Sequence, residues 1–172
     1  MESDEAMMAR VIEGDRDALN GLIDRYSGRL YAYLVRYLRS VEDAEDALQE
    51  TWIRVARSAR KFDRSKSFRS WVYAIATNLG RDQFRRQSSQ RSALSRMEAA
   101  ESIPKEERLQ SLEVRTEIES LPALQREVVL LRYFEGMDEG EMASCLGIAR
   151  GTVKSRLHSA IARLRKTGGD SR

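Results

Sequence analysis

A group of polar and basic residues near the end of the sequence has the chemistry needed to read duplex DNA. Arg150, Lys154 and His158 follow one another at steps of four, a spacing that places them on one face of a helix. Arginine and lysine can bridge the O6 and N7 atoms of guanine, and hydroxyl groups can reach phosphates or base edges. The candidate residues for duplex DNA are Arg150, Gly151, Thr152, Lys154, Ser155, Arg156 and His158.

The segment that leads into this face has the spacing of a helix-turn-helix. Asp138 and Glu141 form a capping-box pattern, which predicts the start of a short helix. Gly147 stands where the tight turn needs a residue that tolerates positive φ. Small Ala143 and apolar Val153 allow two helices to approach closely at their crossing. The alternative is an ordinary helical hairpin with a solvated basic face, but the combination of these residues favours DNA binding.

A second basic zone, between residues 61 and 86, is interleaved with aromatic rings. Single-stranded DNA is held by stacking on such rings and by neutralisation of its backbone charge. Phe68 and Trp71 share an apolar stripe, so we assign both to the core first. The candidate residues of this zone are Lys61, Arg64, Lys66, Arg69, Tyr73, Arg81, Arg85 and Arg86. An acidic stretch separates the two basic zones, which suggests two contacts with a polyanion; two solvated helix faces are the alternative.

Hydrogen-bond acceptors crowd one predicted helix upstream of this zone. Such a surface suits a basic partner helix, with Trp52 as an aromatic anchor, although a solvated acidic face is the alternative. The acidic and amide residues are Asp43, Glu45, Asp46, Gln49 and Glu50.

Apolar periodicity and capping residues predict the helices that position these groups. The first half is predicted to form four helices, over residues 3–13, from a cap at Asp15 to about residue 38, from Ser40 to residue 60, and over 68–90. Few large apolar residues follow, so residues 91–110 are interpreted as a linker. A short helix near residues 112–120 comes next, and Pro122 is expected in the first turn of another, with Leu124, Val128, Leu131 and Tyr133 or Phe134 on its inner face. We therefore predict an all-α fold with two small domains.

Composition excludes several classes of protein. The chain has 172 residues, a formal net charge of +3, one histidine and one cysteine. A single cysteine cannot form an internal disulfide or a multi-cysteine metal site, and no run approaches the ~18 apolar residues of a membrane span. The acidic N-terminal segment lacks the apolar region of a signal peptide, so the cytoplasm is expected. We find no nucleotide-binding loop and no nucleophile motif, and we expect no cofactor, no metal and no catalysis.

Four segments together resemble the extracytoplasmic-function sigma factors of the bacterial sigma-70 family. The resemblance covers nearly the whole chain. The segments also occur in the order and spacing of that family, which makes the combination specific. They are DAEDALQETWIRV (residues 43–55), FRSWVYAIATNLGRDQFRR (68–86), LPALQREVVLLRYFEGM (121–137) and GIARGTVKSRLHSAIARLR (147–165).

This resemblance implies a function and a set of partners. Residues 1–90 would be a four-helix sigma-2-type domain that binds core RNA polymerase and opens the −10 element, and residues 111–172 a sigma-4-type helix-turn-helix domain that reads the −35 element. The acidic helix would bind the clamp coiled coil of the polymerase β′ subunit, and the β subunit, promoter DNA and an anti-sigma factor would be further partners. Asn78 and Asp82 match a family pattern that adds Asn78 to the −10 candidates, and residues 61–67 would capture an unstacked base.

Two residues depart from the pattern of this family near the recognition helix. Ala149 is a poor cap before the recognition helix, and Gly140 lies inside the preceding helix; each costs about 1 kcal/mol.

A response regulator with a similar C-terminal motif is one rival function, but the first half of the chain lacks the alternating strands of a receiver domain. A sigma-like protein that sequesters a partner without reading promoters is the other, and a transcription assay would separate them.

Overall fold

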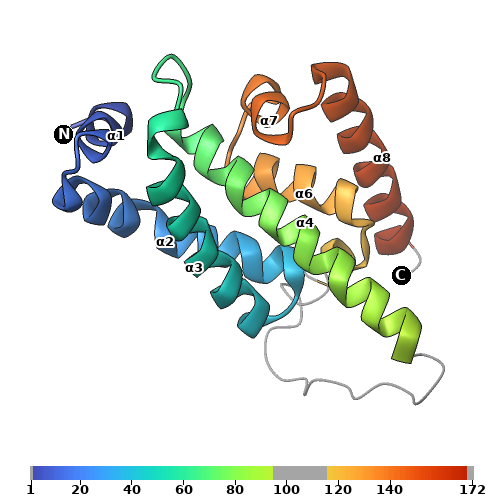
Figure 1. The fold of residues 1–172 in the computed structure, drawn as a ribbon. Coiled ribbons are helices and arrows are strands. Elements are labelled where there is room, and N and C mark those ends of the chain that lie inside the picture. Colours follow the sequence, from blue (N-terminus) through green and yellow to red (C-terminus); the bar gives the residue numbers. More distant parts are fainter. Residues whose placement is uncertain (1, 95–115, 170–172) are drawn as a thin grey trace.

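A computed structural model describes residues 2–94 and 116–169, and within these ranges the chain forms helices joined by turns, as the all-α prediction requires (Figure 1). The N-terminal part contains α1 (Asp4–Ile12), α2 (Arg16–Leu38), α3 (Val41–Ser58), the 3₁₀ turn η1 (Ala59–Lys61) and α4 (Phe68–Leu94). The C-terminal part contains a helical turn over 116–120, α6 (Ala123–Val129), the π-helical turn η2 (Leu130–Phe134), α7 (Glu139–Leu146) and α8 (Arg150–Gly169).

Side-chain caps begin four of these helices where the sequence predicts helix starts. Ser3 accepts a hydrogen bond from the Ala6 amide, and Asp15 accepts from the amides of Asp17 and Ala18. Ser40 accepts from the Asp43 amide at 3.2 Å. Asp138 and Glu141 form a complete capping box at the start of α7. Each cap satisfies amide groups that the first turn of a helix leaves without a partner.

Aromatic rings from α2 and α4 form the centre of the N-terminal bundle. Tyr33, Tyr37, Tyr73 and Phe68 are fully buried, and the Tyr33 and Tyr73 rings meet edge to face at 5.6 Å between centroids. Helix α3 contributes Ala44, Ala47, Thr51 and Val55. Val41, at the first position of α3, lies outside this core and is 56% exposed.

The inner face of the C-terminal part also differs from the predicted one. Val128 and Leu131 are buried as expected, but Leu124, Tyr133 and Phe134 are exposed. The π-helical turn η2 explains why Tyr133 and Phe134 are exposed. In this turn the Glu135 amide donates to the Leu130 carbonyl, five residues back, and the wider turn shifts the phase of the side chains relative to an α-helix. Pro122 lies at the cap position of α6, one residue before the predicted first turn.

Only the first residues of the expected linker over 91–110 lie within the described ranges. Helix α4 continues to Leu94, and the remaining residues of the linker lie outside the described ranges, as do Leu112 and Val114 of the predicted short helix. Ile118, from the same prediction, is buried.

The two parts of the chain pack directly on each other. Helix α4 contacts α3 and also α7, and α2 contacts η2 and α6. Figure 1 shows α4 running between α3 and the C-terminal helices. Arg126 of α6 ties the parts together, since its Nη1 donates to the Tyr37 carbonyl at 2.6 Å. Both faces of α4 are therefore occupied along part of its length.

Candidate nucleic-acid interface

The acceptor-rich face of α3 is exposed, as the sequence predicts, with one exception. Glu45, Asp46 and Gln49 are exposed, and Glu50 is half-buried with its carboxylate 2.9 Å from Arg54 Nε. Asp43 instead turns toward α4, where its carboxylate accepts hydrogen bonds from Gln83 (3.2 Å) and Gln87. The assignment of Asp43 to the partner surface is therefore corrected to a contact between helices.

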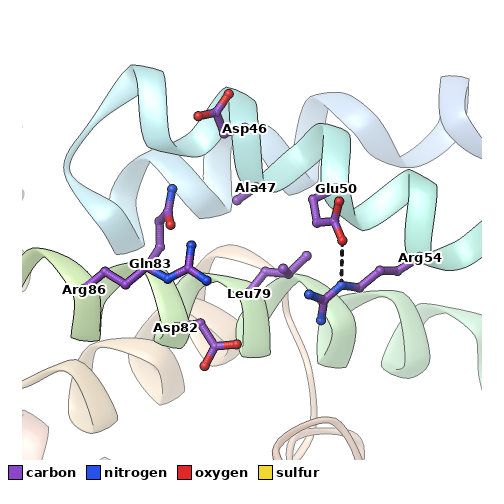
Figure 2. A pocket seen from close by; sticks show the side chains of 8 residues that line it. All are labelled: Asp46, Ala47, Glu50, Arg54, Leu79, Asp82, Gln83 and Arg86. Atoms are coloured by element: carbon purple, nitrogen blue, oxygen red, sulfur yellow. Dashed lines mark hydrogen bonds and ion pairs between the residues drawn. The ribbon is translucent and has the colours of Figure 1, made fainter.

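A groove of about 350 Å³ runs between α3 and α4 beside this face. Figure 2 shows Asp46 and Glu50 on the α3 side of the groove and Asp82 and Arg86 on the α4 side. Trp52 is half-buried against the core rather than displayed as an anchor. The neighbouring Thr51 is fully buried, and its hydroxyl donates to the Ala47 carbonyl at 2.7 Å.

One part of the predicted −10 surface lies open to solvent. Lys61 at the end of η1 is exposed, as are the loop residues Arg64 and Lys66. Asn78, Arg85 and Arg86 on α4 are exposed as well. A groove of about 310 Å³ joins the loop to the helix and is lined by Arg54, Arg57, Ser58, Lys61, Ile75 and Asn78. Sequence reasoning missed Arg54 and Arg57. Arg54, Arg57 and Lys61 follow one another at steps of three and four residues in the sequence, and this spacing is the signal for a basic side of α3.

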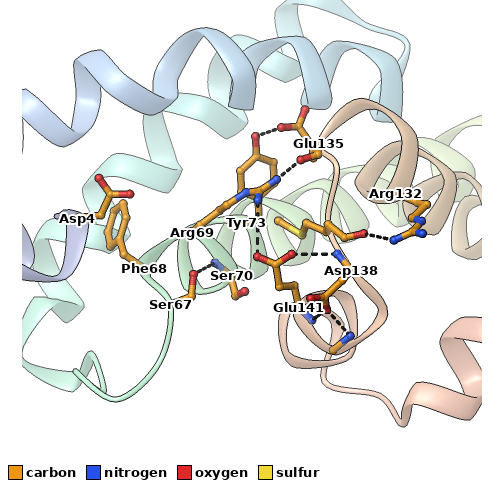
Figure 3. A network of polar contacts seen from close by, with 12 residues as sticks. Asp4, Ser67, Phe68, Arg69, Ser70, Tyr73, Arg132, Glu135, Asp138 and Glu141 are labelled. Atoms are coloured by element: carbon orange, nitrogen blue, oxygen red, sulfur yellow. Dashed lines mark hydrogen bonds and ion pairs between the residues drawn. The ribbon is translucent and has the colours of Figure 1, made fainter. Parts of the chain in front are cut away.

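Three other −10 candidates contact the C-terminal part of the chain. Arg69 approaches Glu141 at 3.6 Å and donates to the Glu135 carbonyl, and the Tyr73 hydroxyl donates to the Glu135 carboxylate (Figure 3). Arg81 binds Glu127 through two parallel hydrogen bonds of 2.8 and 2.7 Å. Tyr73 is fully buried, so in this arrangement its ring packs in the core and cannot stack on a base.

The electrostatics of these contacts shift the ionisation of the groups involved. The hydrogen bonds from Arg81 to Glu127 raise the pKa of the arginine. Burial raises the pKa of Tyr73, and the nearby Glu135 carboxylate raises it further. Arg81 and Tyr73 therefore hold their protons throughout the physiological pH range, and Tyr73 acts as a neutral donor.

The helix-turn-helix places the −35 candidates on the outer side of α8. Gly147 ends α7 with φ of +65°, which confirms its predicted role in the turn. Arg150, Gly151, Lys154, Ser155 and His158 are exposed, and Thr152 is half-buried. Lys154 Nζ lies 3.5 Å from Glu139, within the same motif. Arg156 differs from the others because its Nη1 contacts the buried Glu127 carboxylate at 3.2 Å.

Gly140 lies close to a side chain of the predicted −35 surface. A Cβ atom at this position would lie 2.3 Å from Nη2 of Arg150, which is the far end of a flexible, exposed side chain that can move aside. The lower helix propensity of glycine therefore remains a cost to α7.

The single cysteine of the chain is buried in α7. Burial raises the pKa of the Cys145 thiol to about 12, so this cysteine stays protonated and unreactive. In residues 2–94 and 116–169 no cluster of three or more histidine, cysteine or acidic side chains could hold a metal ion. Among the same residues, no helix has both the length and the apolar composition needed to cross a membrane.

The fold and its surfaces define a helical DNA-binding protein, and comparison with known proteins identifies its family. Residues 22–90 match the family model of sigma-70 region 2, and residues 111–164 match that of sigma-70 region 4. The chain is 31% identical to the ECF RNA polymerase sigma factor SigW of Bacillus subtilis, over 91% of this chain and 92% of SigW. It is also 31% identical to the ECF RNA polymerase sigma-E factor of Escherichia coli K12, over 92% and 90% of the two chains.

Solved structures agree on the fold. CnrH, solved in complex with the cytosolic domain of CnrY, superposes with a TM-score of 0.78 at 24% identity, over 99% of this chain and all of the other. The sigma factor RpoE of Bartonella quintana, solved with the anti-sigma factor NepR, gives a TM-score of 0.72 at 22% identity, over 89% and 98% of the two chains. The chain belongs to the ECF sigma factors of the sigma-70 family, which direct RNA polymerase to promoters.

Proposed function

We propose that this sigma factor divides promoter recognition among three surfaces. The exposed acidic face of α3 binds the clamp coiled coil of the polymerase β′ subunit. The groove bounded by Lys61 and Asn78, with the loop over residues 61–67, binds the opened −10 strand. The outer face of α8, with Arg150 and Lys154, reads the −35 element in duplex DNA.

One observation carries this proposal: the exposed surfaces differ in charge and are presented by different helices. Carboxylates gather on α3, while guanidinium and ammonium groups line the groove at Asn78 and the outer face of α8. Acceptor-rich helices suit basic protein partners, and basic grooves suit nucleic-acid backbones. The division follows the predicted domain limits of 1–90 and 111–172, joined by a linker over 91–110.

The remaining parts of the proposal concern partners and setting. CnrH and the RpoE of Bartonella quintana were each solved in complex with a protein partner, and the partner of RpoE is named as an anti-sigma factor. We therefore include an anti-sigma factor, together with the β and β′ subunits and promoter DNA, among the partners of this chain. We assign it no catalytic activity and no cofactor, and we place it in the cytoplasm with the polymerase.

Transcription reconstituted from purified components tests the proposed function. Core RNA polymerase supplemented with this chain is expected to produce transcripts with defined start sites from fragmented genomic DNA, and sequencing those transcripts reveals the shared −35 and −10 elements. Core polymerase alone is the control. Polymerase binding without promoter-specific transcripts would favour the rival function, in which the protein sequesters a partner.

Asn78 is predicted to act only after the strands separate. Its side chain is exposed in the groove beside Lys61, and its amide can bond the edge of an unstacked base, which closed duplex does not offer. Asn78→Ala should leave closed-complex affinity within about twofold and reduce permanganate reactivity of −10 thymines about tenfold or more, as expected for the loss of one good base contact worth ~1–3 kcal/mol.

The outcome depends on when the loss appears. Ser89→Ala, an exposed position farther along α4, serves as the matched control. If Asn78→Ala weakened closed-complex formation as much as it weakened melting, the residue would belong to one undivided duplex-binding surface.

A further inference from the structure

Buried aromatic rings hold the two ends of the loop over residues 61–67. Phe62, near its start, is 5% exposed, and Phe68, directly after it, is fully buried. Their ring centroids lie 6.1 Å apart, and the Trp71 ring lies 5.1 Å from Phe62 and 6.1 Å from Phe68. The segment proposed to capture a base of the −10 element therefore begins and ends on one aromatic cluster.

The loop forms a defined turn between these rings. Asp63 Oδ1 accepts hydrogen bonds from the Ser65 amide at 3.0 Å and from the Ser65 hydroxyl at 2.7 Å. The Lys66 amide donates to the Asp63 carbonyl at 2.9 Å. The bonds from Ser65 lower the pKa of the Asp63 carboxyl, so this group stays ionised at neutral pH and remains an acceptor. The loop thus has its shape in the chain without DNA.

Helix α1 supplies the acceptor for the amide at which the loop becomes α4. Glu5 Oε1 accepts from the Phe68 amide at 3.1 Å, although the two residues are 63 positions apart in the sequence. Ser67 accepts from the Ser70 amide at 3.3 Å, as Figure 3 shows. The first amides of a helix have no partner within it, and a carboxylate there is favoured by the helix dipole. Glu5 therefore fixes the residue at which the loop ends.

The preceding residue of α1 supports Phe68 from its ring. The Tyr26 ring meets the Phe68 ring edge to face at 5.4 Å between centroids, and the Tyr26 hydroxyl donates to the Asp4 carboxylate. Asp4 also accepts from Arg25 Nη1 at 2.6 Å. Two successive residues of α1 thus act on Phe68, Glu5 through its amide and Asp4 through the Tyr26 ring.

Helix α1 lies outside the part of the chain that matches the sigma-70 region 2 model, which begins at residue 22. It nevertheless contacts both η1 and α4, the two elements that flank the loop. Ordering a loop around a ligand costs conformational entropy, and a loop that is already held in shape avoids much of this cost. These contacts give α1 a means of acting on the −10 strand without touching it.

We propose that α1 is a positioning element for the −10 loop and that Glu5 is its positioning residue. Through the Phe68 amide, Glu5 holds the loop in the shape that receives an unstacked base before DNA arrives. This inference rests on the proposed function for the role of the loop. It adds the element that prepares the loop for that role.

Glu5→Ala in the holoenzyme tests the role of Glu5. This change removes the acceptor of the Phe68 amide, whereas Glu5→Gln keeps an oxygen that can accept the same bond. The probe is a fluorescein-labelled single strand with the −10 element read from the transcripts. Glu5→Ala should lower the affinity about fivefold, the order of loss for one helix-capping hydrogen bond, and Glu5→Gln should stay within about twofold of wild type. An equal loss in both variants would overturn the role of the hydrogen bond.

Abasic strands separate positioning from a general loss of stability. Each strand of a set lacks one base of the −10 element. At the position that the loop captures, the penalty of Glu5→Ala should disappear, because the loop has no base to receive; at the other positions it should stay at about fivefold. A penalty of the same size at every position would mean that Glu5 only stabilises the bundle, and the proposal would be overturned.

Glu13→Ala is the matched control. It removes an exposed carboxylate at the opposite end of α1, so it should bind every strand as the wild type does. If Glu5→Ala loses its helical circular dichroism, Tyr26→Phe decides the matter, because it keeps the ring on Phe68 and removes the hydrogen bond to Asp4. A penalty relieved at one abasic position supports the proposal, and binding like the wild type to every strand refutes it.

The wild-type holoenzyme distinguishes a failure of this inference from a failure of the proposed function. If no abasic position weakens its binding, the loop captures no base, and the proposed function of the loop fails together with the positioning role. If one position weakens it but does not relieve the penalty of Glu5→Ala, only the positioning role of α1 fails.

Discussion

Core polymerase is expected to lose this sigma factor when Asp46 and Glu50 are both changed to lysine. Both side chains line the groove on α3, and Asp46 is fully available to a partner. Against a basic helix, each reversal replaces an attraction by a repulsion. Removing one member of a desolvated charge pair costs on the order of 3 kcal/mol, so the double variant should bind more than about a hundredfold more weakly. Co-purification with core polymerase and a competition titration measure the loss.

The fold should tolerate these two changes. Glu50 loses an ion pair with Arg54 in which both side chains are more than one third exposed, a contact worth only about 0.3–0.5 kcal/mol within a helix. Glu13→Lys combined with Asp24→Lys reverses two exposed charges elsewhere in the N-terminal part and serves as the control. If the control pair lowers polymerase binding as strongly as the α3 pair, net charge is responsible and the interface lies elsewhere.

A second large effect is expected at the recognition helix. The Lys154 side chain is 65% exposed on the outer face of α8, and its Nζ lies 3.5 Å from the carboxylate of Glu139, which is 39% exposed. Lys154→Ala or Arg150→Ala should cost ~1–3 kcal/mol at particular −35 base pairs and little at others, because a contact to a guanine edge is lost. Holoenzyme binding to a set of singly substituted −35 elements provides the measurement.

Arg85 offers the contrast to Lys154. It is 76% exposed on α4, where it forms an ion pair with Asp82, three residues earlier. As a contact to phosphate, Arg85→Ala should weaken binding to every sequence by a similar factor and reduce the salt slope by about one. Identical base-pair profiles for Lys154→Ala and Arg85→Ala would contradict the assignment of base reading to α8.

Local signals in the sequence predicted the helices and the turn well. Ser3, Asp15, Ser40 and Asp138 all cap helices, and Gly147 adopts the left-handed conformation that the helix-turn-helix requires. These features depend on backbone groups within three or four residues, which is the range that a sequence pattern records. The exposed residues of α3 and α8 follow from the same periodicity.

Contacts between distant segments could not be predicted in this way. Arg81 and Glu127 are 46 residues apart, and nothing in the local pattern of either helix indicates the partner. Arg69 and Tyr73 have the residue types of a DNA-binding surface, but tertiary packing directs both toward Glu135. The π-helical turn likewise displaced Tyr133 and Phe134 from the predicted core, because an ideal helical period does not describe it.

The depth of Glu127 has a consequence for how ionic strength acts on the free protein. At physiological salt, mobile ions screen the interaction between exposed charges that lie more than about 8 Å apart. They hardly reach a carboxylate that has no accessible surface. Contacts between arginines and DNA behave in the opposite way, since binding releases condensed counterions and weakens steeply as salt is added. The Arg81 guanidinium therefore has a partner in this structure that resists screening by salt, whereas a contact of the same group with DNA would weaken as salt is added.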